Sequence, residues 1–540
     1  MDIKYAAIKE LAKAGFKTRE SLESFKRKVS AKYGIPLLTN TELLKEYHNL
    51  VEKGMMGPSA KLENLLKTRG IRSLSGIIVV SVLTRPYPCG GKCLFCPTQK
   101  GVPKSYLDGE PAVMRALANK FDPYLQVQNR LKALENTGHP IDKIDLRIIG
   151  GTWSYNPKKY QTWFIKRCFE ACNDYDKKQK TKNKKLQLKT ENLEKLQKAN
   201  ENAKCRIIGV NVETRPDYID IKEIKRLRKL GVTRVELGVQ STYDNVLDLN
   251  NRGHKIDATI KATKLLKDAG FKICYQMMPN LPGSNLEKDE KMFEELFQNL
   301  NFQPDQLKIY PCALLKEAPL YWVKDKIGYK PYNVDELREL LKEAKKKIPY
   351  YCRIQRVIRD IPSTKITEGG AKAVSLRQDL AKDQIKEGWR CKCIRCREVK
   401  GDYNPKEKIY LFRENYEASG GREIFLSFEN KSRTKLFSLL RLRVPAEVQP
   451  PLSFQTLKDS AIIREIQTYG QVHPIGQGPA LSKSPQHKGL GKKLMKEAEK
   501  IAKQESGLKK IAVIAGVGAR PYFRKLGYQL KDTYMVKRII

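Results

Sequence analysis

The chain has 540 residues, 40% of them hydrophobic and 8% aromatic, so it is not a disordered protein and is long enough for about three to four domains. It contains no run of about 18 apolar residues, which predicts no membrane span, and its N-terminus lacks the apolar core of a secretory signal. The formal net charge of +44 points to a polyanionic partner, because each neutralised phosphate of a nucleic acid releases condensed counterions. A proteome that is rich in lysine throughout would give the same excess of charge.

Residues 1–75 are predicted to form a small, basic helical domain. Apolar residues recur at helical spacing in 4–17 and 20–34, and Pro36 and the stretch KGMMGP at 53–58 interrupt the periodic segments. The positive charge of this region makes it a candidate contact surface for nucleic acid.

Residues 76–360 alternate short β-rich runs with helical patterns. This alternation predicts a parallel sheet of βα units, closed or partly closed into a barrel, with functional residues at the C-terminal ends of the strands. The lysine-rich stretch 177–200 interrupts the pattern, either as a solvated insertion or as an arm that contacts RNA. The predicted strands are 76–84, 144–151, 207–214, 234–241, 272–279 and 307–311.

A group of three cysteines, Cys89, Cys93 and Cys96, follows the first predicted strand in the segment CGGKCLFC. Such close spacing in a chain without a secretory signal favours a metal centre over disulfides, and a cytoplasmic location. Three thiolates hold three irons of a 4Fe–4S cluster and leave the fourth iron open for S-adenosylmethionine, which is then cleaved to an adenosyl radical. The pattern is typical of the radical S-adenosylmethionine superfamily. The alternative is a zinc knuckle that borrows a distant ligand, which the βα pattern disfavours.

Glycine and polar residues end the next three predicted strands, where we expect them to bind S-adenosylmethionine. Glycines let a ligand approach the backbone closely, and in the superfamily a glycine pair after the second strand meets the amino group of the methionine. Glu213 and Arg215 suit ribose and a carboxylate respectively, although a surface ion pair would have the same sequence. The candidate residues are Gly150, Gly151, Thr152, Glu213, Arg215 and Gln240.

A second group of cysteines occurs in the segment RCKCIRC. Cys391, Cys393 and Cys396 again count to three, and Cys312, at the end of the sixth predicted strand, is the closest plausible fourth. Four thiolates would close a tetrahedral structural zinc site. A second cluster or free thiols are the alternatives. The pair at 168 and 172, on an apolar helix, is expected to consist of core residues.

Residues 405–540 are predicted to form an α+β domain with antiparallel strands first. Its glycine loop QHKGLG, with Gln486, Gly489 and Gly491, precedes a helix, and backbone amides at a helix N-terminus bind anions such as pyrophosphate. The pattern matches the acyl-CoA loop of the GCN5-related N-acetyltransferase (GNAT) fold, and a Rossmann loop is the main competitor. Tyr522 and Phe523 lie on the next predicted helix, where the tyrosine would hydrogen-bond the CoA thiol or thioester, or else be a core aromatic.

This order of motifs closely resembles that of the Elongator catalytic subunit in its archaeal form. The resemblance runs through nearly the whole chain, in blocks such as GHPIDK, VETRPDYI, MMPNLPG and QHKGLG. It implies an α/β fold built around a partial (β/α)6 radical S-adenosylmethionine barrel. The implied domains are an N-terminal helical tRNA-binding domain (1–75), the barrel (76–360), a zinc-binding connector (361–404) and a C-terminal GNAT α+β domain (405–540).

The resemblance also implies a reaction. The family uses acetyl-CoA and S-adenosylmethionine to form 5-carboxymethyluridine at wobble position 34 of tRNA, and its acyl-donor site includes a lysine that corresponds to Lys143. The strand that runs along the pantetheine corresponds to Glu465, Ile466, Gln467 and Thr468, and the pyrophosphate loop corresponds to Leu490, Gly491 and Lys492. Lys143 and Tyr522 are the implied catalytic residues.

The sequence departs from the family pattern at two places. Gly90, Gly91 and Lys92 stand where a proline–histidine–glycine run is usual, and Phe523 replaces the second of two tyrosines. A protein lysine acetyltransferase, a radical RNA methyl- or methylthiotransferase and an RNA-binding scaffold remain as alternatives. The sequence leaves open the oligomeric state, a homodimer included, and shows no accessory Elongator subunits.

Overall fold

The computed structural model describes residues 3–14, 18–67, 70–175, 192–373, 375–400, 403–446, 454–470, 485–486 and 488–539. The lysine-rich stretch expected at 177–200 lies outside the described residues up to 191, and its remainder contains helix α8 (Leu193–Asn200). Within the described residues, no helix combines the length and apolar character needed to cross a membrane.

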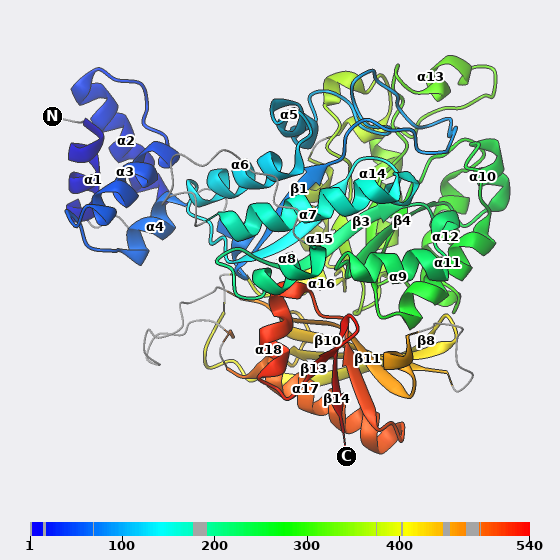
Figure 1. The fold of residues 1–540 in the computed structure, drawn as a ribbon. Helices are drawn as coiled ribbons and strands as arrows, with labels where there is room; N and C mark the ends of the chain where they lie inside the picture. The colour runs from blue at the N-terminus through cyan, green and yellow to red at the C-terminus, as the bar shows by residue number, and fades with distance from the viewer. Residues whose placement is uncertain are drawn as a thin grey trace.

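The N-terminal region is helical, as expected. Its helices are α1 (Ile3–Ala14), α2 (Arg19–Tyr33), α3 (Asn40–Glu52) and α4 (Ala60–Leu66). Thr18 and Thr39 begin α2 and α3 with capping boxes, in which the threonine hydroxyl accepts from the backbone N–H three residues on. These helices share a core of their own and lie to one side of the barrel, next to α6 (Figure 1).

The central sheet is a half-barrel of seven parallel strands in sequential order. The strands are β1 (Ile77–Leu83), β2 (Lys143–Ile149), β3 (Arg206–Thr214), β4 (Arg234–Gln240), β5 (Lys272–Met277), β6 (Gln306–Ile309) and β7 (Arg353–Arg356). The first six match the strands expected from the sequence. The seventh was not predicted, because its four residues, RIQR, carry no apolar run.

Helices cover the outer face of the half-barrel (Figure 1). Their apolar sides pack on alternate strand residues such as Ile144, Leu146, Val235 and Leu237, which form the largest core. The helices of this region are α5 (Pro111–Ala118), α6 (Pro123–Glu135), α7 (Lys158–Asp174), α9 (Ile221–Lys229), α10 (Asp244–Leu249), α11 (Ile256–Asp268), α12 (Leu286–Gln298), α13 (Pro319–Val323), α14 (Val334–Lys347), α15 (Leu376–Lys386) and α16 (Ile394–Arg397). Cys168 and Cys172 on α7 are buried core residues, as expected.

The C-terminal sheet has seven strands in the order β13-β14-β12-β11-β10-β9-β8. All neighbours are antiparallel except β11 and β12. The elements are β8 (Tyr410–Ala418), β9 (Gly421–Glu429), β10 (Leu436–Pro445), β11 (Ser460–Thr468), α17 (Leu490–Lys500), β12 (Lys510–Val513), α18 (Arg520–Arg524), β13 (Gln529–Lys531) and β14 (Tyr534–Arg538). The predicted β-first α+β order is therefore present.

The C-terminal sheet packs against the N-terminal ends of the barrel strands. Gly516 approaches β3 so closely that a Cβ atom there would lie 1.9 Å from the carbonyl oxygen of Ile208. Buried ion pairs join the two parts: Nη1 of Arg464 donates to Asp305 (2.9 Å), and Nε of Arg443 donates to Asp268 (3.0 Å). A desolvated charge is costly unless it is paired, so these contacts hold the two parts in one arrangement.

Candidate functional site

The first cysteine group lies on the loop after β1, at the C-terminal end of the barrel. Cys93 is buried, and Nη1 of Arg252 approaches its sulfur at 3.6 Å. Burial raises the pKa of the Cys96 thiol to about 12, so a thiolate there requires a neighbouring cation. An iron cluster would supply this cation.

The spacing of these three thiols argues against a single metal ion. Around one tetrahedral zinc, the sulfur atoms lie about 3.8 Å apart, given a Zn–S bond of about 2.3 Å. In the described part of the chain, only one group of three or more potential ligands has all its atoms within 4.8 Å, and Cys89, Cys93 and Cys96 do not belong to it. The loop therefore fits a multi-iron cluster better than a zinc knuckle.

The glycine pair after β2 adopts backbone conformations that favour glycine. The φ angles are 123° at Gly150 and 78° at Gly151. A Cβ atom on Gly150 would lie 2.2 Å from the hydroxyl of Thr84, and one on Gly151 would lie 3.9 Å from the Cβ of Cys89. The hydroxyl of Thr84 donates to the carbonyl of Gly150 at 3.0 Å, so the pair, followed by buried Thr152, packs on the end of β1 and lies beside the cysteine loop at Gly151.

Polar side chains at the ends of β3 and β4 face the same loop. The guanidinium of Arg215 is held by Asp217 at 2.7 Å, while its Nη1 is buried without a partner and lies 2.5 Å from where a Cβ on Gly91 would be. Gln240 has a φ of 75°, rare for a residue with a side chain, and its Oε1 is also buried and unpaired. Both atoms are free to bind a polar ligand.

Glu213 points into the barrel interior and is not a surface ion pair. Its carboxylate accepts from Tyr106 at 3.0 Å, Lys308 at 3.0 Å and Gln276 at 3.2 Å. Arg252 was not singled out in the sequence. Its contact with Cys93 is made across 159 positions of the chain, which no local pattern could indicate.

A cavity of about 640 Å³ lies between the C-terminal sheet and the N-terminal end of the barrel. Lys143, the first residue of β2, lines it from the barrel, and Tyr522 lines it from α18. The other expected acetyl-CoA residues that line it are Glu465, Ile466, Gln467, Thr468, Gln486, Gly489, Leu490, Gly491, Lys492 and Phe523. The structure thus brings every residue of the expected thioester site to one cavity.

The glycine loop leads directly into α17. Gly489 precedes the helix with a φ of 72°, so the first backbone amides of α17 open toward the cavity. A Cβ atom on Gly491 would lie 3.2 Å from the hydroxyl of Tyr522. Phe523 is 4% exposed and belongs mainly to the core of the sheet, whereas Tyr522 is 39% exposed.

Barrel residues that the sequence did not single out complete the cavity. Lys272, the first residue of β5, donates to Glu465 at 2.8 Å. Burial alone would raise the pKa of Glu465, but Lys272 and Arg441 outweigh it and hold that pKa at about 2. Glu465 is therefore a fixed anion at the junction of the two parts.

Three family models match this chain. Residues 87–296 match the radical SAM superfamily, 304–387 the radical SAM C-terminal domain, and 476–528 the acetyltransferase (GNAT) family. A radical SAM domain implies S-adenosylmethionine and a 4Fe–4S cluster, and acetyl-CoA fits the GNAT domain.

Similar proteins cover almost the whole chain. The tRNA uridine(34) acetyltransferase of Methanocaldococcus infernus is 45% identical over 523 residues, 94% of this chain and 92% of that protein. The human Elongator complex protein 3 is 36% identical over 556 residues, with 98% and 96% coverage. The solved structure of the archaeal Methanocaldococcus infernus Elp3 with an N-terminal deletion (1–46) covers 86% of this chain and 100% of that one, at 42% identity and a TM-score of 0.73.

The chain belongs to the Elongator complex protein 3 family. In this member of the family, the cysteine loop lies at one end of the barrel, and the cavity lined by the expected thioester residues, named the thioester cavity below after that expectation, lies at the other end. Cys89 follows the C-terminal end of β1, whereas Lys143 begins β2.

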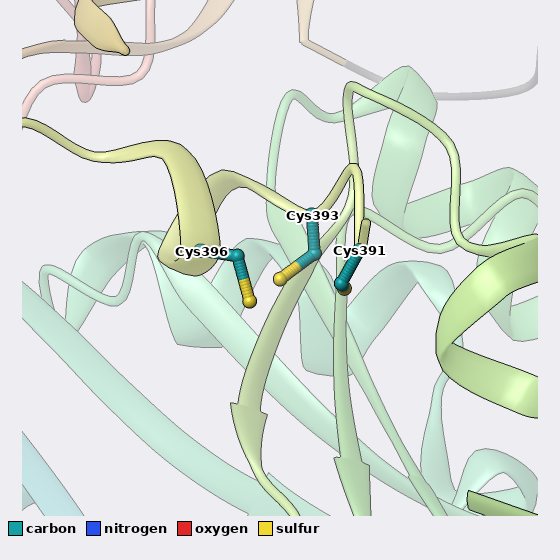
Figure 2. A group of neighbouring side chains, drawn as sticks. All are labelled: Cys391, Cys393 and Cys396. Atoms are coloured by element: carbon teal, nitrogen blue, oxygen red, sulfur yellow. The ribbon is translucent and has the colours of Figure 1, made fainter. Parts of the chain in front are cut away.

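The connector of this Elongator-family chain holds a compact group of thiols. The sulfur atoms of Cys391, Cys393 and Cys396 lie within 4.8 Å of one another, and Figure 2 shows them converging from the loop before α16 and from α16 itself. This arrangement fits three of the four ligands of a tetrahedral ion. The backbone N–H of Ile394 donates to the carbonyl of Cys352 at 2.9 Å, so this group lies at the N-terminal end of β7.

Cys312 does not join this group, contrary to our expectation. It follows the C-terminal end of β6 and packs with Cys93 and Phe95 in the cluster around the first cysteine loop. Because β6 and β7 are parallel, Cys312 and Cys391 lie at opposite ends of the barrel. The sequence could not reveal this, since cysteine spacing does not report at which end of the barrel Cys312 lies; Cys352, which had no spacing signal and directly precedes β7, is the cysteine beside the connector group.

Proposed function

We propose that this chain modifies tRNA, using acetyl-CoA and S-adenosylmethionine to form 5-carboxymethyluridine at wobble position 34. The observation that carries this proposal is the presence, on one rigidly joined barrel and sheet, of an incomplete cysteine cage and a thioester cavity. One of these sites suits radical formation and the other suits an acyl thioester. The relatives named tRNA uridine(34) acetyltransferase support the same substrate.

At the C-terminal end of the barrel, Cys89, Cys93 and Cys96 would hold the cluster. When bound, the cluster supplies the electron that cleaves S-adenosylmethionine to a 5′-deoxyadenosyl radical. The chain's own groups would orient the nucleotide: the backbone at Gly151, beside Cys89, would meet the methionine amino group with Gly150 and Thr152 on either side of it, and the unpaired Nη1 of Arg215 suits the methionine carboxylate. Gln240 offers an unpaired amide oxygen. The carboxylate of Glu213 already accepts hydrogen bonds, so it would accept one from a ribose hydroxyl in addition to those of its present donors.

At the other end, the C-terminal domain would hold acetyl-CoA. Glu465, Ile466, Gln467 and Thr468 on β11 run along the cavity and offer backbone groups to the pantetheine, and Gln486, Gly489, Leu490, Gly491 and Lys492 form the pyrophosphate loop. Lys143 and Tyr522 line the cavity from opposite sides, so each can hold the thioester by a hydrogen bond. Phe523 supports Tyr522 by edge-to-face packing, with ring centroids 5.2 Å apart.

The charge of the chain supports tRNA as the acceptor. A net charge of +44 exceeds what solubility needs, and the basic N-terminal helices form a separate surface for the phosphate backbone. A structural zinc at Cys391, Cys393 and Cys396 would brace the connector between the barrel and the C-terminal sheet. We propose that the enzyme is cytoplasmic. Both candidate sites lie within a single chain.

Mass spectrometry of tRNA tests this function. Reduced enzyme, acetyl-CoA and S-adenosylmethionine should convert the wobble uridine to 5-carboxymethyluridine, and Cys93→Ala should abolish the product by removing a cluster ligand. Cys168→Ala, a change in the core of α7, is the matched control and should keep the cluster. Unmodified tRNA with the wild-type enzyme would contradict the proposal, and rapid acetylation of peptides without RNA would favour a lysine acetyltransferase.

A further inference from the structure

The two candidate sites are separated by the length of the barrel strands. β1 and β2 have seven residues each, and a strand rises about 3.3 Å per residue, so the cysteine loop and Lys143 are on the order of 20 Å apart. A reaction that joins a radical made at one end to an acyl group held at the other requires a route between them.

The barrel interior is largely polar. Parallel barrels are normally filled by branched apolar side chains, but here most apolar residues of the core strands face outward, toward the helices, and Ile77, Val79 and Ile208 are the apolar residues at the base of the interior. Charged and amide side chains contact one another across the interior: Arg234 pairs with Asp145 (3.1 Å), and Asn211 donates to Glu236 (2.7 Å). The other interior residues with polar side chains include Arg147, Glu213, Lys272, Gln276, Gln306, Lys308, Arg353 and Gln355.

A second cavity, of about 280 Å³, occupies the base of this interior. Strand residues Asp145, Gly209 and Arg234 form its walls, and β11 closes its floor. It adjoins the thioester cavity, since Lys272 and Glu465 line both, and the ion pair between these two side chains (2.8 Å) lies where the cavities meet. A group held by the glycine loop would therefore enter the barrel interior past this ion pair.

Buried polar atoms without a hydrogen-bond partner lie both in the barrel interior and at the C-terminal ends of its strands, the mouth of the barrel. Buried polar groups in proteins are nearly always hydrogen-bonded, so an orphan atom calls for a ligand or water. Nε of Arg234 and Oδ1 of Asn211 are such atoms in the interior, and Oε1 of Gln240 and Nε of Arg252 are such atoms at the mouth. All four side chains belong to residues at least nine-tenths buried.

One ionic cluster crosses this interior. Lys308 contacts both Glu213 and Glu236, and Gln276 donates to the same two carboxylates at 3.2 and 3.3 Å. The cluster separates the base cavity from the mouth of the barrel. A ligand group could therefore pass between them only if the long, flexible side chain of Lys308 changed its rotamer.

We propose that the acyl end of the thioester occupies the cavity at the base of the barrel, and that the two-carbon unit meets the radical inside the barrel. This inference rests on the proposed function and names the place where its two halves are coupled. The base cavity is the subsite for a short acyl group, and the walls at Gly209, Asp145 and Arg234 limit the length of that group.

Gly209 provides a direct test, because a side chain there would fill the base cavity. A Cβ atom would lie 3.4 Å from both the carboxylate of Asp145 and the hydroxyl of Thr233, at a backbone conformation open to any residue. Gly209→Ala narrows the cavity and Gly209→Val blocks it. Val210→Ile is the matched control, because Val210 faces the outer core from the same strand.

Binding by cluster-free protein is the first readout. Calorimetry with CoA, acetyl-CoA and butyryl-CoA should show that Gly209→Val binds CoA within about twofold of wild type but binds butyryl-CoA roughly tenfold more weakly, with Gly209→Ala between them. If Gly209→Val lost affinity for CoA as much as for butyryl-CoA, the variant would be misfolded. The comparison of the two ligands would then be made with Gly209→Ala. An unchanged preference between CoA and butyryl-CoA in Gly209→Ala would overturn the acyl subsite.

Deuterium transfer is the second readout. With trideuterioacetyl-CoA, tRNA and dithionite as the one-electron reductant, a methyl C–D bond breaks, a C5′–D bond forms in 5′-deoxyadenosine, and the unpaired electron stays on the methyl carbon. Gly209→Val should still cleave S-adenosylmethionine, but its 5′-deoxyadenosine should contain at least about tenfold less deuterium than that of the wild type. Val210→Ile should transfer as much deuterium as the wild type. Wild-type deuterium in Gly209→Val would overturn the internal route, whereas failure of the wild-type enzyme to modify tRNA would instead refute the proposed function.

Discussion

At the scale of single residues, several side chains and glycines here have little freedom to change. Gly491 is one of them, because a Cβ atom added to it would lie only 3.2 Å from the hydroxyl of Tyr522. Gln240 is another, since its left-handed backbone and unpaired amide are compatible with stability only if the site uses them.

Gly491→Glu should abolish acetyl-CoA binding while sparing the cluster. The new carboxylate would displace Tyr522 and place a negative charge at the N-terminus of α17, where the pyrophosphate should bind. The expected result is a loss of affinity of at least about a hundredfold by calorimetry, with an unchanged iron content. Lys496→Gln, further along the same helix and exposed, lowers the net charge by the same single unit as a control; equal loss there would point to a general electrostatic effect.

Glu465 should make the junction of the two parts sensitive to acid. Its pKa is held at about 2, below the ordinary 4.5, so its contribution to stability is full above pH 4.5 and is lost as the pH falls toward 2. The contribution is on the order of 3 kcal/mol. Glu465→Gln should therefore lower the thermal midpoint most at neutral pH and least near pH 3; a pH-independent difference would refute the role of its charge.

At the scale of elements, the two sheets depend on one another through buried charges. Asp305, just before β6, accepts from Arg464 at 2.9 Å, and the guanidinium of Arg441 lies 3.6 Å away. All three side chains are essentially inaccessible to water. Removing one partner of such a cluster leaves the others as uncompensated charges.

Asp305→Asn should destabilise the whole chain by about 3–5 kcal/mol, because it removes the carboxylate that Arg464 and Arg441 share and leaves each with one carboxylate, Glu423 (3.0 Å) and Glu465 (2.8 Å) respectively. Thermal unfolding followed by circular dichroism measures the change. Asp325→Asn, whose side chain is 89% exposed, is the control and should leave the midpoint within error. A small effect of Asp305→Asn would show that the remaining carboxylates suffice to balance the arginines.

Element by element, the sequence indicated the strands that have several apolar residues and missed the one that has a single one. β1 to β6 each present two or more apolar residues to the core, whereas β7 presents only Ile354 and pairs with β6 alone. The glycine loop was recognisable because its spacing is local. Lys272 and Arg252 were not, because their roles arise from contacts with Glu465 and Cys93, each more than 150 positions away.

Cys312 also shows that sequence spacing does not reveal contacts between distant parts of the chain. Cysteine spacing reports which thiols share a loop, as it did correctly for Cys391, Cys393 and Cys396. It does not report at which end of a strand a distant cysteine lies. A strand end at either side of the barrel has the same sequence appearance, and only the direction of β6 separates Cys312 from the connector.

At the scale of the whole molecule, the excess of positive charge should dominate the affinity for tRNA. We expect the logarithm of the association constant to fall linearly with the logarithm of the salt concentration, because phosphate contacts release counterions. A chain starting at residue 76 should show a shallower slope, since it lacks the basic helices α1 to α4. Filter binding of tRNA between about 50 and 200 mM salt measures both slopes; equal slopes would exclude those helices from the contact.

The close approach of Gly516 to β3 has a consequence for any attempt to divide this chain. No side chain, not even a methyl group, fits between that loop and the carbonyl of Ile208. A cut within the connector would yield two fragments, each exposing half of a buried charge cluster to water. The barrel and the C-terminal sheet should therefore be expressed together, since neither surface is built to face solvent alone.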